Sequence, residues 1–327
     1  MFKSRVKRSG FFVPVLFLYL FFISSSALSQ YSIPKFDVQG HRGARGLMPE
    51  NTIPAFKMAL DSGVTTIELD LAVTKDGQLV VSHEPWMNAA ICTNPNGESI
   101  NPKKEMAFNL YKMTYAEISQ WDCGSKDYPV YPEQKKLKVS KPLLKDVIEA
   151  VEDHIKSYSR YEVDYNIEIK SDPRGDNLFH PAPKEFSDLV VGTLSQYLPM
   201  ARVIIQSFDF RVLQYIHKYY PNVRIAVLVE NEKSIDTNLK NLGFVPEVYS
   251  PEWKLLTAER VKYLHSKKPS LVRKENGNGK KNGPARMLRV IPWTVNEIAD
   301  MKKLKAMGVD GLITDYPNRA KNLELDL

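Results

Sequence analysis

The chain has 327 residues, of which 43% are hydrophobic, so it is long and apolar enough to bury a sizeable core. Its formal net charge is +7, but residues 1–29 hold four basic and no acidic residues, which leaves +3 for residues 30–327. The remaining basic excess gathers between residues 267 and 281 without interleaved aromatic residues, a composition that excludes a nucleic-acid groove.

Residues 1–29 have the pattern of a secretory signal peptide. Basic residues precede an apolar run over residues 11–23, and a small-residue stretch follows it. Ala27 and Ser29 stand at the −3 and −1 positions of a cleavage site before Gln30. An uncleaved anchor is the alternative, but the apolar run is short for a bilayer span. We therefore expect an exported protein, periplasmic or secreted, with no stable membrane span once the signal is removed.

From residue 36 onward, short β-branched runs alternate with amphipathic segments, which is typical of a mostly parallel α/β sheet. Eight strands separated by helices favour a TIM-type (β/α)8 barrel filling residues 30–327. A doubly wound open sheet is the rival, but no glycine-rich phosphate loop follows the first strand. The predicted strands cover residues 36–39, 65–73, 165–169, 202–207, 224–229, 245–249, 287–292 and 311–314.

Two of the predicted helices carry start and stop signals. Residues 49–52 open a helix that Gly63 ends. Asn296 is expected to cap a helix over residues 297–307, which Gly308 ends.

Two insertions interrupt the regular spacing. Residues 84–136 leave the carboxyl end of a strand hairpin over residues 65–82, so we expect them over the barrel mouth. Residues 266–285 precede a strand and belong at the opposite end. The first insertion holds Cys92 and Cys123, which can pair in an oxidising compartment; two reduced thiols are the alternative.

Acidic residues stand at the ends of two predicted strands. Glu68 and Asp70 share one face of a strand because they are two residues apart, and so do Glu168 and Lys170. Three carboxylates would then converge among apolar neighbours, where they need a positive partner. Such an all-oxygen set suits one divalent cation, Ca²⁺ or Mg²⁺, rather than zinc. Lys170 is then either an ion-pair partner of Glu168 or a group that neutralises phosphate charge.

Further polar residues end other apolar runs of the chain. His41 and His83 each end such a run, and two histidines can divide base and acid work. Arg42 can hold a phosphoryl group through two parallel hydrogen bonds, or it is tied into an ion pair with a neighbouring glutamate. Asn51 either caps the following helix or supplies an oxygen ligand for substrate.

Nine ordered segments of the chain resemble the glycerophosphodiester phosphodiesterase family, in its exported bacterial form. They span nearly the whole chain beyond the signal. The segments are HRG (41–43), PENT (49–52), ELD (68–70), TKDG (74–77), VVSH (80–83), EIK (168–170), QSF (206–208), PWTVN (292–296) and GVDGLITDYP (308–317).

The resemblance implies a TIM-type barrel and a role for each candidate residue. One divalent cation would lie on the three carboxylates, with His41 and His83 as the acid–base pair. Arg42 and Lys170 would stabilise phosphate charge. Phe208 and Trp293 would line the glycerol side, although barrel-core packing is an alternative for both aromatic rings.

The implied reaction is hydrolysis of a small glycerophosphodiester to glycerol 3-phosphate and an alcohol through a cyclic phosphate. Glu84 stands where the family commonly has aspartate, which puts the choice of alcohol in doubt. Two alternatives stay open. A lysophospholipase D-like hydrolase would need an apolar groove in residues 84–136, and a non-catalytic phosphodiester-binding barrel would lack acid–base groups. The sequence gives no oligomeric state.

Overall fold

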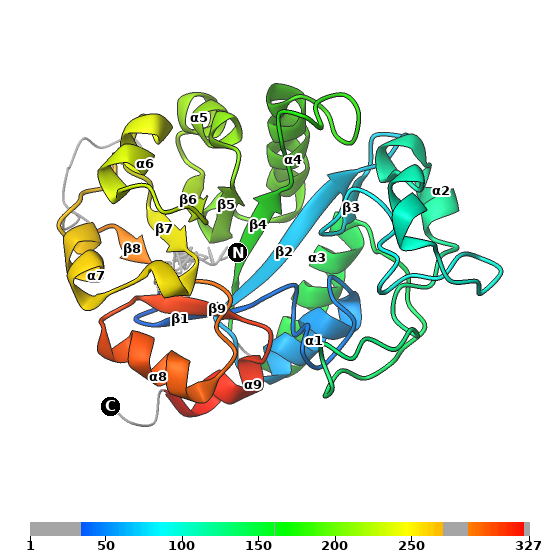
Figure 1. The fold of residues 1–327 in the computed structure, drawn as a ribbon, viewed down its shortest axis with the longest axis horizontal. Coiled ribbons are helices and arrows are strands. Elements are labelled where there is room, and N and C mark those ends of the chain that lie inside the picture. The colour runs from blue at the N-terminus through cyan, green and yellow to red at the C-terminus, as the bar shows by residue number, and fades with distance from the viewer. Residues whose placement is uncertain (1–33, 160, 271–286, 324–327) are drawn as a thin grey trace, which may run out of the picture. The chain divides into compact units, whose positions relative to one another are not determined.

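Eight parallel strands form the barrel of the computed structural model, which describes residues 34–159, 161–270 and 287–323 (Figure 1). Neighbouring strands follow the order β8–β7–β6–β5–β4–β2–β1–β9. Each corresponds to one predicted strand, with only small shifts at the ends. Their bounds are β1 (Asp37–Gly40), β2 (Thr66–Val73), β4 (Asp164–Ile169), β5 (Val203–Ser207), β6 (Arg224–Val229), β7 (Val248–Pro251), β8 (Arg289–Val290) and β9 (Gly311–Thr314).

Backbone hydrogen bonds also join the two ends of this strand order. The amide of Asp310 donates to the carbonyl of Val290 at 2.9 Å, and the amide of Ile313 donates to the carbonyl of Pro292 at 2.9 Å. An open doubly wound sheet would leave both edge strands without such partners. The predicted TIM-type barrel is therefore confirmed, and the doubly wound alternative is wrong.

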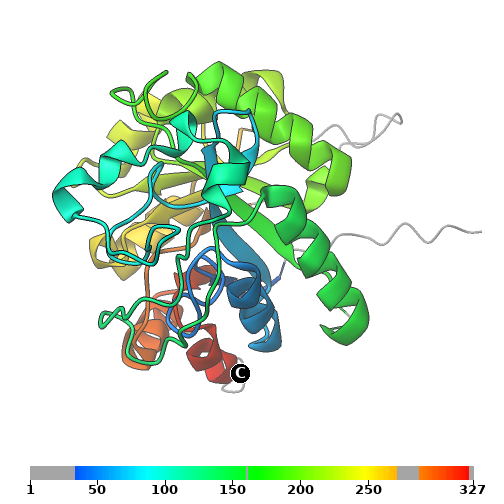
Figure 2. The same ribbon diagram turned by 90° about the vertical axis from the view of Figure 1, so that its right-hand side faces the viewer.

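Helices cover the outside of the strands (Figures 1 and 2). The apolar core lies between the two layers, as expected when each helix buries one face on a sheet. The helices are α1 (Ile53–Asp61), α2 (Tyr115–Ile118), α3 (Leu144–His154), α4 (Pro183–Tyr197), α5 (Phe210–Tyr219), α6 (Ile235–Leu242), α7 (Ala258–His265), α8 (Ile298–Ala306) and α9 (Pro317–Ala320).

The helix ends confirm one predicted signal and correct another. Thr52 caps α1 by accepting from the amide of Ala55, and Gly63 follows the helix with a φ of +85°. The predicted cap at Asn296 is wrong, because α8 begins after Glu297 and lacks a side-chain cap. The side chain of Asn296 instead binds Asp315, whose carboxylate accepts its amide at 2.8 Å.

The barrel interior is divided into an apolar side and a polar side. Apolar side chains fill the part formed by β5 to β9: Ile204, Ala226, Val248, Ile291 and Ile313. On β1, β2 and β4 the inward side chains are polar and joined in a chain of hydrogen bonds. Asn166 donates to Gln39 at 2.7 Å and to Gln206 at 2.9 Å, and Gln206 donates to Glu68 at 2.7 Å. Through this network, Gln206 holds the carboxylate of Glu68 in place.

The insertion over residues 84–136 lies beside β2 and the antiparallel strand β3 (Leu79–Val81) in Figure 1. It has a small core of its own, which packs against Ala72 and Val80 and includes Met87, Leu110, Ile118 and Trp121. That it covers the barrel mouth stays a prediction. Most of the second insertion and the whole of residues 1–29 lie outside the described residues. No helix among the described residues is long and apolar enough to cross a membrane.

A disulfide joins Cys92 and Cys123 within this insertion, so the alternative of two reduced thiols is wrong. Replacing both cysteines with serine is expected to lower the free energy of unfolding by about 3–4 kcal/mol, because the cross-link restricts a loop of 31 residues in the unfolded chain. Guanidinium unfolding of the wild type and the double variant measures the difference. Equal unfolding midpoints for the two proteins would contradict the expectation.

Candidate active site

The turn after β1 places His41 and Arg42 at the carboxyl end of the barrel. The amide of His41 donates to the carbonyl of Thr314 at 2.9 Å, so the turn is held to the end of β9. Arg42 and Gly43 both have positive φ, at +50° and +84°. A Cβ on Gly43 would come within 2.6 Å of the backbone of Ala55, so only glycine fits between the turn and α1.

Three buried carboxylates meet at the ends of β2 and β4. Oxygen atoms of Glu68, Asp70 and Glu168 all lie within 4.8 Å of one another. Parallel register explains the meeting, since Asp70 pairs with Glu168 across the two strands. The three residues are 1%, 1% and 6% exposed, respectively. The predicted cluster of acids therefore exists.

Burial and mutual repulsion act on the pKa values of the three acids, against the effect of the neighbouring cationic groups. Burial, followed by the charge of Asp70, raises the pKa of Glu68. Burial also raises the pKa of Glu168, against the effect of Lys170. Burial opposes ionisation of Asp70 as well, but the charges of His83 and Arg42 lower its pKa. Asp70 Oδ1 is buried without a hydrogen-bond partner among the described residues. A cluster of this kind can bind a metal ion.

Arg42 and Asn51 flank Asp70. The Arg42 guanidinium bonds Glu50 at 2.9 Å, and its Nε lies 3.4 Å from Asp70 Oδ2. The backbone amide of Arg42 donates to Glu68 at 2.7 Å. Asn51 does not cap α1, so that alternative is wrong; its amide donates to Asp70 at 2.8 Å. The ion-pair alternative for Arg42 is thus correct, and its place beside the carboxylates keeps a phosphate-binding role available.

Lys170 and His83 stand on the other side of the carboxylates. Lys170 Nζ donates to Glu168 at 2.9 Å and lies 3.2 Å from His83 Nε2. The opposite nitrogen of His83, Nδ1, lies 2.8 Å from the carboxylate of Glu84. Burial opposes ionisation of Glu84, but its hydrogen bond with His83 lowers its pKa. An ionised Glu84 only accepts hydrogen bonds, so His83 Nδ1 carries a hydrogen.

His41 is held in the same manner by Asp315. Its Nδ1 lies 2.7 Å from Asp315 Oδ1, and Arg45 Nε donates to the same oxygen at 2.8 Å. Although burial opposes its ionisation, the charge of His41 and its hydrogen bond lower the pKa of Asp315. An ionised Asp315 fixes the hydrogen on Nδ1 and leaves Nε2 of His41 as a proton acceptor. Burial and then the charge of Arg45 lower the pKa of His41 to about 4.

The low pKa of His41 predicts a pH-dependent loss of stability. In the unfolded chain this histidine takes up a proton near pH 6.5, whereas in the folded chain it does so only near pH 4. Its contribution is therefore fully present above pH 6.5 and is lost as the pH falls toward 4, by about 3 kcal/mol in total. Urea unfolding in chelator should show a shallower loss over this interval for His41→Asn than for the wild type or His154→Asn. Parallel pH profiles of all three proteins would contradict this.

Two aromatic rings close the site on the side of β5 and β8. The rings of Phe208 and Trp293 meet edge to face with centroids 5.5 Å apart, and Lys170 Nζ lies 5.9 Å from the Phe208 centroid. Trp293 packs against the apolar interior and donates to the carbonyl of Ser250 at 2.9 Å, as the core-packing alternative predicts. Phe208 is 38% exposed and is therefore free to contact a ligand.

The structure brings all ten predicted site residues to one end of the barrel. Sequence reasoning missed the residues that hold them, above all Asp315 and Arg45. Asp315 follows β9 as the other polar residues follow their strands, so the same signal could have found it. Arg45 lies within an irregular turn and Glu84 within an insertion, where periodicity gives no indication of direction.

Comparison with known proteins gives a consistent result. Residues 41–319 match the glycerophosphoryl diester phosphodiesterase family. A glycerophosphodiester phosphodiesterase of Bacillus subtilis is 30% identical over 85% of this chain and 83% of its own. The human lysophospholipase D GDPD1 is 26% identical over 86% of this chain and 84% of its own.

A solved structure supports the fold. An Oleispira antarctica phosphodiesterase, solved in complex with its product sn-glycerol-3-phosphate, superposes with a TM-score of 0.65 at 20% identity, covering 89% of this chain and 97% of that one. The match to the family covers most of the chain, from the HRG turn to α9. The chain therefore belongs to the glycerophosphoryl diester phosphodiesterase family, and it is an enzyme of that family.

Proposed function

We propose that this chain hydrolyses glycerophosphodiesters to glycerol 3-phosphate and an alcohol in a metal-dependent reaction with two histidines as acid and base. One observation carries the proposal: three buried carboxylates within 4.8 Å of one another have cationic groups and a histidine beside them. This is the arrangement that phosphoryl transfer needs, because negative charge must be bound and a proton must be moved.

The carboxylates of Glu68, Asp70 and Glu168 would hold one divalent cation, Ca²⁺ or Mg²⁺. Asp70 Oδ1, which has no hydrogen-bond partner among the described residues, and the raised pKa of Glu68 both fit a bound cation, since the cation would take the place of a proton on Glu68. When bound, the cation supplies positive charge against the negative charge that develops on the phosphoryl oxygens.

Arg42 and Lys170 bind the phosphate from opposite sides of the carboxylates. Both stay charged, since the surrounding acids raise their pKa values against the effect of burial. A phosphate between them would exchange its hydration for hydrogen bonds that are already oriented. Asn51 fixes Asp70 and so keeps the phosphate side of the carboxylates in place.

The histidines move the protons in two steps. One accepts the proton of the glycerol 2-hydroxyl as that oxygen attacks phosphorus, while the other donates a proton to the departing alcohol. A cyclic glycerol phosphate results. In the second step the roles reverse: water attacks phosphorus, the ring opens, and glycerol 3-phosphate leaves. Asp315 and Glu84 hold the Nδ1 hydrogens of His41 and His83, which leaves both Nε2 atoms for proton transfer once a phosphate binds Lys170, whose Nζ lies 3.2 Å from Nε2 of His83.

Release of glycerol 3-phosphate tests this proposal. Purified protein is stripped with EDTA and then incubated with glycerophosphocholine, -ethanolamine and -inositol in Ca²⁺, in Mg²⁺ or without either ion. We expect glycerol 3-phosphate only where an ion has been restored. No product under any of these metal conditions would refute the proposal. A substrate that lacks the 2-hydroxyl should not react, because the cyclic intermediate cannot form.

A lysophospholipase D-like activity is the second candidate, since the human relative carries that name. The structure does not favour it. Within residues 84–136, Met87 is fully buried and Phe108 packs against Trp121 in the insertion's own core. Lysophosphatidylcholine should therefore be a poor substrate beside glycerophosphocholine. A non-catalytic binding barrel is disfavoured because the acids and both histidines are present and oriented.

We also propose that the protein is exported, on the strength of the pattern in residues 1–29. Mass spectrometry of the protein recovered from the periplasm or medium should find Gln30 at its amino terminus. Retention of residues 1–29 on a cell-associated protein would show an anchor instead.

A further inference from the structure

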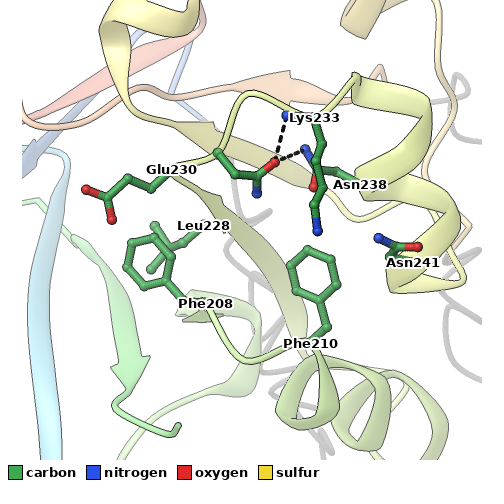
Figure 3. A pocket seen from close by; sticks show the side chains of 8 residues that line it. Phe208, Phe210, Leu228, Glu230, Lys233, Asn238 and Asn241 are labelled. Carbon is green, nitrogen blue, oxygen red and sulfur yellow. Dashed lines mark hydrogen bonds between the residues drawn. The ribbon is translucent and has the colours of Figure 1, made fainter.

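A hollow of about 360 Å³ opens between the loops that follow β5 and β6 (Figure 3). It adjoins the candidate active site through Phe208, whose ring centroid lies 5.9 Å from Lys170 Nζ. The catalytic proposal leaves this hollow without a role. We call it the β5–β6 hollow. The residues that line it are Phe208, Phe210, Leu228, Glu230, Asn231, Lys233, Asn238 and Asn241.

Phe208 separates two regions of the barrel mouth. Trp293 packs edge to face against its ring, with an interplanar angle of 88°, and the hollow with Leu228 and Phe210 lies next to it (Figure 3). A phosphodiester has two ester arms. If Lys170 holds the phosphate, one arm can pass on the Trp293 side and the other into the hollow. The family resemblance puts glycerol beside both rings, on the side where Trp293 contacts Phe208, which leaves the hollow for the other arm.

We propose that the β5–β6 hollow binds the departing alcohol, and that this alcohol is a small zwitterion carrying both an ammonium and a carboxylate, as serine does. The inference rests on the proposed function. It names the substrate class of the same site.

Charge at the two ends of the hollow specifies this class. Glu230 lies at the end near Phe208, and Lys233 lies near Asn238 and Phe210 (Figure 3). Both side chains are exposed, and within the described part of the chain neither charged end has an ion-pair or hydrogen-bond partner, so both ends are available to a ligand. An ammonium would contact Glu230 and the face of Phe208, and a carboxylate would reach Lys233. A simple cation such as choline would satisfy Glu230 alone.

The amides of the hollow are already held in place. Asn231 Oδ1 accepts from the backbone amide of Lys233 at 3.0 Å and from Asn238 Nδ2 at 3.2 Å. Asn238 is buried and also donates to the hydroxyl of Tyr249 at 3.3 Å. Polar groups fixed in this way suit a ligand that forms hydrogen bonds. An acyl chain would remove them from water without replacing those bonds, so the hollow does not fit a lipid tail.

Three substrates test the proposal: glycerophosphoserine, glycerophosphoethanolamine and glycerophosphomethanol, the last too short to enter the hollow. Lys233→Gln should lower kcat/KM about three- to tenfold on the serine diester only. Glu230→Gln should lower it by a similar factor on the serine and ethanolamine diesters, and neither variant should affect the methyl diester. Lys240→Gln and Glu232→Gln are matched controls, because both residues are exposed and lie outside the lining.

Unchanged hydrolysis of the serine diester by both lining variants, or an equal loss on all three substrates, would overturn the proposal. Failure of the proposed function would look different. In that case the wild-type protein would release no glycerol 3-phosphate even from the methyl diester.

Discussion

Replacing His41 or His83 with asparagine is expected to lower kcat on a glycerophosphodiester by about 10²–10⁴-fold, the usual contribution of a positioned acid or base. Each histidine has its Nδ1 hydrogen fixed by a carboxylate, so in the proposed mechanism its Nε2 would exchange protons with substrate. Initial rates of glycerol 3-phosphate release measure the effect. His154→Asn is the control, because this histidine lies on α3, paired with Asp61 and away from the site.

An activated substrate separates the two roles. Glycerol 3-phosphate esterified to p-nitrophenol has a leaving group that needs no proton. The variant that lacks the acid should recover most of its activity on this ester, whereas the variant that lacks the base should not. Loss of less than tenfold for both variants on the ordinary diester, with thermal stability unchanged, would exclude acid–base catalysis by this pair.

Chelation of divalent cations is expected to abolish activity and to lower thermal stability. Three buried carboxylates repel one another when no cation is bound, and a cation present at 100 times its Kd would stabilise the folded chain by about 2.7 kcal/mol. Scanning calorimetry with Ca²⁺ or Mg²⁺ against EDTA measures this. Because ligand carboxylates must lose their protons, the raised pKa values of Glu68 and Glu168 predict that affinity increases with pH.

Glu168→Gln gives the sharpest form of this prediction. The variant loses one ligand and one of the repelling charges, so its Tm in EDTA should be at least that of the wild type, while added cation should no longer raise it. Glu149→Gln, on the exposed face of α3, should behave as the wild type. A full response to cation in Glu168→Gln would show that the ion is bound elsewhere.

The barrel could be predicted from the sequence because its strands have a strong local signal. Each β-branched run between amphipathic segments corresponds to one strand, and the parallel connections leave few arrangements. The ends of the helices were harder to predict. Asn296 has the right residue type and place for a cap, but both ends of its side chain bind Asp315. Its Oδ1, the acceptor that a cap needs, takes the backbone amide hydrogen of Asp315 at 2.9 Å, and its Nδ2 donates to the carboxylate of the same residue at 2.8 Å.

The carboxylates and histidines could be predicted because alternation on a strand fixes which side chains point inward. Their partners could not. Glu84 comes from an irregular segment, and Arg45 reaches Asp315 across 270 residues of sequence. Such pairings depend on how the loops pack against one another, which the local pattern of residues does not predict. For the same reason the β5–β6 hollow could not be predicted, because its lining comes from the loops after β5 and β6 together with residues of α5, β6 and α6.

A crystal structure with Ca²⁺ or Mg²⁺ and sn-glycerol 3-phosphate would test the central claim most directly. We predict one cation bound by Glu68, Asp70 and Glu168, the phosphate between Arg42 and Lys170, and Nε2 of both histidines within hydrogen-bond reach of phosphate or glycerol oxygens. A phosphate bound away from the carboxylates, or a cation on other ligands, would contradict the account.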